Sequence, residues 1–554
     1  MRTNVLPRPA RQIKTPSFVC EVPLVLAGAD ERVLGVRFDV ARQTYNACLS
    51  EALRRLDLMR QSKEYQAARK LPRGQRGSRA AKIRAAAFRR VNKRFGFREY
   101  DLHAWATEHI SHQWLGEHLD SNTVQTLATR AFRAAQQHAF GNKGRPRFKG
   151  KNHLDSVEGK SNASGIRWRD DHVEWLGLNL AAIIDPRDPV VAHGLSSRVK
   201  FVRLVRRRLN GKTRYWAQLV CEGLPYRKEK NTIGTGLVGI DPGPRLFGIS
   251  GIDWGALVDL ATPLKATRKE IRRLRRHIDR QRRANNPDNY LPDGRIRPGP
   301  KEWCKSAKQR QAELRLAELQ RKAAAQRKTQ HGQLTNAILR LGDDIRIEKN
   351  SYRSFQRNYG RSVGIAAPAG FVTGFKRKAS ACLAGPKAGA QARDLPARLR
   401  LSQMCHGCGG IEKKPLSLRI HKCVCGIGPV QRDVYSAWLA TTAIADPFGS
   451  DEWRLDANQA QKTWSGAEQR LPVASSPTSV QAFAAWAKKA ARGSRVTARP
   501  PVGGTERLAG KARTMIDEAR DAVGSCHDQV LFDVMACREP EKVNRVAATR
   551  TPAL

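Results

Sequence analysis

The stretch LVGIDPGPRLFGISGI, residues 237–252, carries the strongest fold signal in the sequence. Its two apolar runs flank a turn rich in Pro and Gly, a pattern typical of two strands joined as a hairpin. The first run ends on Asp241, so the predicted hairpin places a carboxylate at the end of a buried strand. We therefore expect this segment to begin a sheet and to contribute to a functional site.

Two further carboxylates occupy comparable positions. Glu348 follows IRI in DIRIEKN, residues 344–350, which is typical of a short strand, and Asp433 precedes VYSAWLA at the start of a helical pattern. The three lie far apart in sequence, so only the fold could bring them together. Two divalent ions about 3.5–4 Å apart can cleave a phosphodiester, and Mg²⁺ prefers carboxylate oxygens. One acidic residue at a strand end is more often a solvated cap, so the hypothesis depends on all three together.

Four cysteines form a second candidate site, in the motifs CHGCGG and CVC. Paired thiolates at short spacing on two turns are typical of a structural zinc site. The predicted zinc ligands are Cys405, Cys408, Cys423 and Cys425. The second pair is separated by one residue instead of the usual two, so His406 or His421 could replace a cysteine. A surface or supporting role is our preferred interpretation of both histidines.

The charge of the chain indicates a polyanionic partner. Its 554 residues include 101 Lys and Arg against 50 Asp and Glu, a formal net charge of +51. Neutralising phosphates with release of counterions is the physical reason why such a surface binds nucleic acid. The cations are spread through segments with helix and strand patterns, which favours grooves lined with cations. Charge alone would fit a basic structural RNA-binding protein equally well.

The sequence predicts no membrane association. No run of about 18 apolar residues occurs, and the start of the chain lacks the apolar segment of a secretory signal. We expect a protein of the bacterial cytoplasm or nucleoid. The cysteines outside the cluster are predicted to be free thiols in a reducing compartment.

With these motifs in hand, the chain resembles TnpB, the transposon-encoded RNA-guided nuclease, and the related compact type V CRISPR effectors. The resemblance spans about residues 15–446, in RQTYNACLSEAL, GRPRFKG, RYWAQLVCEG, GIDPGPRLFG, IRIEKNSYRSF, CHGCGG, HKCVCG and QRDVYSAWLA. Its most specific part is the cysteine cluster followed directly by Arg432, Asp433 and a helix. One departure is Tyr435, which stands where TnpB proteins commonly carry Asn.

The resemblance implies an RNA-guided DNA endonuclease. A guide RNA would supply sequence specificity by pairing with target DNA, and the protein would read a short flanking motif as a monomer or homodimer on the guide. Asp241, Glu348 and Asp433 would be the catalytic ligands of two Mg²⁺ ions in an RNase H-like, RuvC-type domain. The predicted nucleic-acid contacts are Arg145, Arg147, Lys149, Arg353, Arg357 and Arg432.

The expected fold class is multidomain α+β and α/β. The first strand is expected to pair with the later strands across a helical insertion, because a lone strand leaves its backbone groups without partners. The predicted ranges are first wedge strands 1–30, helical recognition lobe 31–140, wedge β-barrel 141–232, RuvC first part 233–262, basic helical hairpin 263–340, RuvC second part 341–400, zinc ribbon 401–430, RuvC third part 431–446 and a largely disordered extension 447–554.

Three other functions stay open at this stage. The first is an RNA-guided DNA-binding protein with weak or no cleavage, and the second is a transposon-associated nuclease that acts without a guide. The third is a basic structural RNA-binding protein, which would need neither the three carboxylates nor the cysteine cluster.

Overall fold

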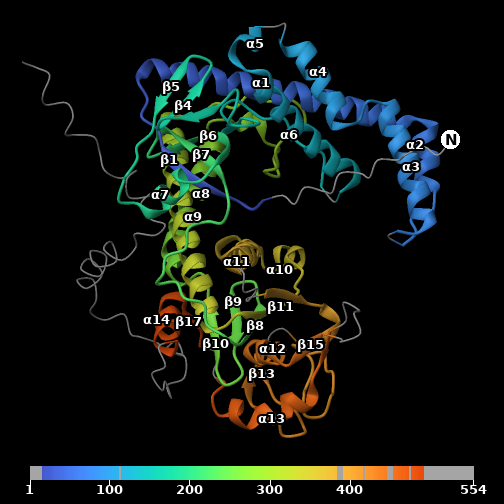
Figure 1. Ribbon diagram of the computed structural model, residues 1–554, viewed down its shortest axis with the longest axis vertical. Helices are drawn as coiled ribbons and strands as arrows, with labels where there is room; N and C mark the ends of the chain where they lie inside the picture. The colour runs from blue at the N-terminus through green and yellow to red at the C-terminus, as the bar shows by residue number, and fades with distance from the viewer. Residues whose placement is uncertain are drawn as a thin grey trace, which may run out of the picture. The chain divides into compact units, whose positions relative to one another are not determined.

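The computed structural model describes residues 15–75, 77–111, 114–141, 143–383, 391–415, 418–445, 453–472 and 476–491 (Figure 1). The chain forms two units, an N-terminal unit, Met1–Tyr226, and a C-terminal unit, Arg227–Leu554. Each is described by itself. Among the helices described, none combines the length and the hydropathy needed to cross a bilayer.

Helices make up the first half of the N-terminal unit, as the sequence predicted for residues 31–140. They are α1 (Gly28–Gln61), α2 (Lys63–Lys70), α3 (Arg79–Arg94), α4 (Glu99–Ser111), α5 (Trp114–His118) and α6 (Ser121–Phe140). Buried side chains recur along α1 at intervals of three or four residues, for example Leu34, Phe38, Ala41 and Tyr45, which gives the helix one apolar face. That face packs along α6.

The second half of the N-terminal unit is antiparallel. Its four-stranded sheet has the order β1 (Ser17–Pro23), β7 (Lys212–Glu222), β6 (Val199–Leu209), β2 (Ser156–Glu158). A second sheet contains β3 (Arg167–Arg169), β4 (His172–Trp175) and β5 (Leu178–Ala181), and the short helix α7 (Pro189–Leu195) precedes β6. The ladder between β1 and β7 confirms the predicted pairing across the helical insertion. A bridge from Leu24 to Ala182 links the two sheets. Beside this bridge the Val25 N–H donates to the Ala181 carbonyl and the Ile183 N–H to the Pro23 carbonyl, both at 2.8 Å, and the wedge β-barrel stays a prediction.

A mixed six-stranded sheet organises the C-terminal unit. Its order is β12 (Gln391–Leu395), β11 (Asp344–Glu348), β8 (Leu237–Pro242), β9 (Leu246–Ser250), β10 (Gly255–Asp259), β17 (Thr478–Ser479). β8, β9 and β10 are antiparallel neighbours, as the predicted hairpin requires. β11 runs parallel to both β8 and β12, so two of the predicted motifs lie side by side.

Helices and short strands surround this sheet. The helices are α8 (Lys265–Ala284), α9 (Ala307–Leu341), α10 (Tyr352–Ala366), α11 (Pro368–Leu383), α12 (Arg432–Thr441), α13 (Ala457–Glu468) and α14 (Val480–Ala490). The short strands are β13 (Ile420–His421), β14 (Val430–Gln431), β15 (Ala443–Ala445) and β16 (Trp453–Leu455). The long helices α8 and α9 agree with the basic hairpin predicted for residues 263–340.

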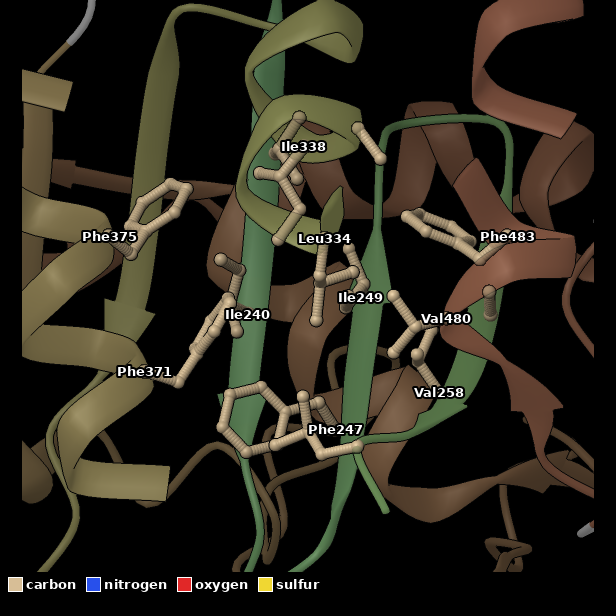
Figure 2. Close-up of a cluster of buried hydrophobic side chains, with 14 of the residues drawn as sticks. Ile240, Phe247, Ile249, Val258, Leu334, Ile338, Phe371, Phe375, Val480 and Phe483 are labelled. Carbon is tan, nitrogen blue, oxygen red and sulfur yellow. The ribbon is translucent and has the colours of Figure 1, made fainter. Parts of the chain in front are cut away.

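Strand alternation divides the sheet into two faces. One face packs against α9, α11 and α14, and Figure 2 shows its buried side chains, which include Ile240, Phe247, Ile249, Val258, Leu334, Ile338, Phe371, Phe375, Val480 and Phe483. Because neighbouring residues of a strand point to opposite faces, Gly239 and Asp241 of β8 and Glu348 of β11 belong to the other face. That face packs against α12.

The expectation of a largely disordered extension is wrong for residues 453–472 and 476–491, and the rest of the extension lies outside the described residues. β17 joins the edge of the main sheet beside β10, and β16 pairs with β15. Trp464 of α13 and Phe483 of α14 are buried in the two cores of the unit. The segment folds because these aromatic side chains bury apolar surface against the sheet and α12, which outweighs the weak propensity of short helices.

Candidate functional site

Two of the predicted acidic residues lie at the carboxyl ends of adjacent parallel strands, Asp241 one residue before the end of β8 and Glu348 at the end of β11. Ile240 of β8 pairs with Ile347 of β11, so Asp241 and Glu348 occupy the next position of each strand. Both point to the face that packs against α12. Asp241 is 8% exposed, and Glu348 is partly buried. The segment between the two strands contains the long helices α8 and α9, and after it β11 places Glu348 next to Asp241.

Asp433 is brought to the same place by α12. The helix begins at Arg432, and its N-cap Gln431 accepts a hydrogen bond from the Val434 backbone at 2.7 Å. The close approach of α12 to the sheet depends on two glycines of the sheet. A Cβ on Gly239 would overlap the carbonyl oxygen of Ala437, and a Cβ on Gly248 would overlap the carbonyl oxygen of Asp433. Asp433, in the first turn of α12, therefore lies directly over β9, the strand that follows β8 and Asp241.

The three carboxylates interact electrostatically. Burial, then the charges of Glu348 and Asp433, raises the pKa of Asp241 well above its ordinary value. Burial also raises the pKa of Glu348, with a further contribution from Asp433. Removing charged oxygens from water and placing them near each other costs free energy unless a cation offsets it. The sequence-predicted trio therefore forms one acidic cluster.

The hydrogen-bond partners of this cluster were not predicted from the sequence. The Asn350 side chain donates to Asp241 Oδ1 at 3.4 Å and to the Pro242 carbonyl at 3.0 Å. Ser436, one helical turn after Asp433, donates to Glu348 Oε2 at 3.3 Å. The signal for Asn350 was its place two residues after Glu348, at the carboxyl end of the same strand. Ser436 could only be found once α12 was known to lie along β11.

Two arginines flank Asp433. Arg419 lies 3.4 Å from Asp433 Oδ2 and its side chain is 48% exposed, whereas Arg432 lies 3.3 Å from Oδ1 and is only 7% exposed. Arg432 also donates to the Pro415 carbonyl at 3.1 Å. Arg432 is thus largely enclosed by protein groups, and its contact with nucleic acid stays a prediction. Arg419, which the sequence analysis missed, is the accessible cation at this site.

The acidic cluster fits a hard divalent cation in its chemistry. Its donors are carboxylate oxygens, the preferred ligands of Mg²⁺, and a cation would offset the cost of burying them together. The ligand atoms of the acidic cluster are less closely grouped than those of the cysteine site. In the described part of the chain, the cysteines are the group whose ligand atoms all lie within 4.8 Å of one another.

The four predicted zinc ligands meet in one cluster. Cys405 Sγ lies 3.5 Å from Cys425 Sγ, and Cys408 Sγ lies 3.5 Å from Cys423 Sγ. The Cys425 backbone N–H lowers the pKa of Cys423 to about 7, while burial raises that of Cys405 to about 12. Four sulfur donors at these distances can hold a tetrahedral zinc ion.

Neither histidine replaces a cysteine in this cluster. His406 Nδ1 lies 2.7 Å from the Tyr435 hydroxyl, and His421 Nδ1 lies 2.8 Å from Lys414 Nζ. Burial lowers the pKa of both rings to about 4, so both are neutral near pH 7. This agrees with the supporting role that we preferred for them.

The other predicted nucleic-acid contacts lie on the surface of their own units. In the N-terminal unit Arg147 is exposed, Arg145 pairs with Asp57 at 3.1 Å, and the backbone of Lys149 bonds the Asn46 side chain. In the C-terminal unit Arg353 and Arg357 are exposed on α10, which begins four residues after Glu348. Their exposure is compatible with nucleic-acid contact, which stays a prediction.

Comparison with known proteins gives distant similarities. No protein-family model matches the sequence, and no curated protein matches it. The chain is similar to a structure described as the Cas12f1–sgRNA–target DNA complex, with a TM-score of 0.38 and 10% identity, covering 78% of this chain and 99% of that one. A CRISPR–Cas12f ternary complex gives a TM-score of 0.27 and 11% identity, with the same coverage. Similarity at this level carries no argument about function, which must come from the residues themselves.

Proposed function

We propose that this protein is an RNA-guided DNA endonuclease with an RNase H-like, RuvC-type active site. The observation that carries the proposal is the convergence of Asp241, Glu348 and Asp433 over one end of the mixed sheet. They come from a first strand, a later parallel strand and a helix start, in the order that the resemblance to TnpB implies. The neighbouring cysteine cluster runs directly into the helix that carries Asp433.

In this proposal the three carboxylates hold two Mg²⁺ ions. When bound, Mg²⁺ would supply an activated water and stabilise the leaving oxygen of a phosphodiester. The chain's own residues orient the carboxylates: Asn350 fixes Asp241, and Ser436 fixes Glu348. The exposed guanidinium of Arg419 can hold a phosphate of the strand to be cut, because it reaches solvent while remaining beside Asp433.

We propose that the protein binds a guide RNA because of its resemblance to TnpB and because of its net charge. A net charge of +51 suits a protein that holds both a guide RNA and target DNA in cation-lined grooves. The helical lobe and the antiparallel sheets of the N-terminal unit are proposed to be the recognition lobe and wedge. A cytoplasmic or nucleoid location and a monomer or homodimer on the guide belong to the same proposal.

The test is to purify the protein with its bound RNA and sequence that RNA. We expect a discrete RNA species with a variable end. We also expect the protein to cleave DNA in the presence of Mg²⁺, and to cleave a different DNA sequence when the variable end of the RNA is changed to match that sequence. Bulk ribosomal fragments, or cleavage that ignores the rewritten end, would contradict guiding.

A specific observation favours a second candidate, an RNA-guided DNA-binding protein with weak cleavage. Asp433 is engaged by both Arg419 and Arg432, and these ion pairs compete with a divalent cation for its oxygens. The two candidates differ in the cleavage rate at saturating Mg²⁺ with guide and target bound. A rate indistinguishable from that of an Asp241→Ala variant would select the second.

A further inference from the structure

Tyr435 stands at the junction between the cysteine cluster and the acidic cluster. It lies two residues after Asp433 on α12, is 1% exposed, and is one of the largest fully buried side chains of the protein. Its ring stacks on His421, with centroids 4.2 Å apart, and lies near Trp438. Its position in the sequence is the one at which this chain departs from the Asn common in TnpB proteins.

The Tyr435 hydroxyl bonds the first cysteine turn. It accepts a hydrogen bond from the His406 backbone N–H at 3.1 Å and lies 2.7 Å from His406 Nδ1. The hydroxyl therefore contacts both the backbone and the ring of the same residue. His406 is the residue between Cys405 and Gly407, so this pair of bonds holds the turn that carries Cys405 and Cys408.

The second cysteine turn reaches α12 by the chain itself. β13 and β14 pair as Ile420 with Gln431 and His421 with Val430, and β14 leads directly into Arg432 and α12. The Arg432 backbone N–H also donates to the Arg419 carbonyl at 2.8 Å. The start of α12 is thus tied to one half of the cysteine site by β14 and to the other half by Tyr435.

We propose that Tyr435 is a positioning residue that couples the metal-loaded cysteine cluster to Asp433, so that loss of that metal displaces Asp433 and weakens divalent-cation binding at the acidic cluster. The proposal rests on the proposed function, because it assigns a role to the geometry of the same carboxylates. A metal bound by the four sulfurs would hold both turns, and the Tyr435 hydroxyl would fix the first turn to α12, the helix that carries Asp433 in its first turn.

The first test is Tyr435→Phe in the full-length protein with its copurified RNA. Phenylalanine keeps the ring that stacks on His421 and removes only the hydroxyl. We expect zinc content and melting temperature close to wild type, Mn²⁺ binding measured by electron paramagnetic resonance weakened about fivefold, and a similar rise in the Mg²⁺ concentration for half-maximal cleavage. A merely structural defect would lower the active fraction at every metal concentration without moving that midpoint.

Two matched variants make the test specific. Tyr290→Phe removes a buried tyrosine hydroxyl that has no hydrogen-bond partner among the described residues, and it should leave Mn²⁺ binding within twofold of wild type. His406→Leu removes the ring contact but keeps the backbone N–H bond to the Tyr435 hydroxyl, so it should weaken Mn²⁺ binding less than Tyr435→Phe does. The double variant should bind Mn²⁺ no more weakly than Tyr435→Phe, because removing the hydroxyl already removes both of its contacts with His406.

The decisive experiment removes zinc with a chelator from wild type and from Tyr435→Phe. Zinc removal should weaken Mn²⁺ binding about fivefold in wild type and add little in Tyr435→Phe, whose coupling is already broken. Equal losses in the two proteins, or an unchanged Mn²⁺ affinity in Tyr435→Phe, would overturn the role of Tyr435 while Asp241→Ala still abolishes Mn²⁺ binding. If Asp241→Ala itself binds Mn²⁺ like wild type, the proposed function fails and this inference fails with it.

Discussion

The acidic cluster and the cysteine cluster are built in opposite ways. The cysteines come from two nearby turns, and their sulfur atoms all lie within 4.8 Å of one another. The carboxylates come from β8, β11 and α12, and burial raises the pKa of both Asp241 and Glu348. One site is therefore local and expected to stabilise its surroundings when loaded, whereas the other depends on the whole sheet and carries an energetic cost. Variants of the acidic cluster should therefore change mainly the cleavage rate, and variants of the cysteine cluster should change mainly the stability of the fold.

The largest expected effect is on cleavage by Asp241→Ala. Loss of a metal ligand should lower the cleavage rate by on the order of 10³ or more, with RNA and DNA binding within severalfold, because metal ligands act mainly on the chemical step. The melting temperature should stay the same or rise, since the variant removes a buried carboxylate near two others. Asp253→Ala is the matched control, because that carboxylate is exposed and pairs with Arg470. Near-normal cleavage by Asp241→Ala would refute the site.

The cysteine cluster should show the reverse pattern. Cys405→Ser combined with Cys408→Ser should remove zinc and lower both the soluble yield and the melting temperature, because structural zinc contributes folding free energy. Elemental analysis and thermal unfolding measure the two effects, and Cys304→Ser, an exposed thiol outside the cluster, is the control. Full zinc content in the double variant would show that the ligand set is wrong.

A smaller effect is expected where the sheet meets α12. Gly239→Ala should lower the free energy of unfolding by about 2 kcal/mol or more, because its Cβ would overlap the Ala437 carbonyl. Gly466→Ala in α13 meets nothing within 4 Å and should be neutral or slightly stabilising. Chemical denaturation measures both. Equal stability of the two variants would mean that α12 does not approach the sheet as closely as described.

The smallest effect should come from Ser436→Ala. It removes the hydroxyl that donates to Glu348 at 3.3 Å, so the cleavage rate should fall severalfold with little change in unfolding free energy. Kinetics at several Mg²⁺ concentrations would measure this. An unchanged rate at all concentrations would show that Glu348 needs no support from α12.

The sequence predicted the parts of both sites that have a local signal. Asp241 and Glu348 end apolar runs, and the four cysteines stand in two short motifs, so pattern and spacing were sufficient to single these residues out, while the metals that they would hold stay predictions. Ser436 and Arg419 were missed because their roles arise only when α12 and the cysteine turns lie against the sheet. Arg432 was predicted to be a nucleic-acid contact, and the low exposure of its side chain, 7%, could not be predicted, because charge in a sequence does not indicate burial.

The C-terminal segment shows another limit. Val480, Phe483 and Ala487 of α14 recur at helical spacing and are buried, so a signal existed in a segment that the sequence analysis expected to be disordered. β17 has only two residues, Thr478 and Ser479, and no apolar pattern. It is a strand because β10 offers a free edge to pair with, which is a property of the folded sheet and not of those two residues.

The central claim is that three carboxylates distant in sequence hold divalent cations together. Its most direct test is anomalous scattering from crystals of the protein soaked in Mn²⁺. The account predicts manganese within ligand distance of Asp241, Glu348 and Asp433, and none there in Asp241→Ala. Manganese bound elsewhere, with these three side chains each paired to protein groups alone, would contradict it.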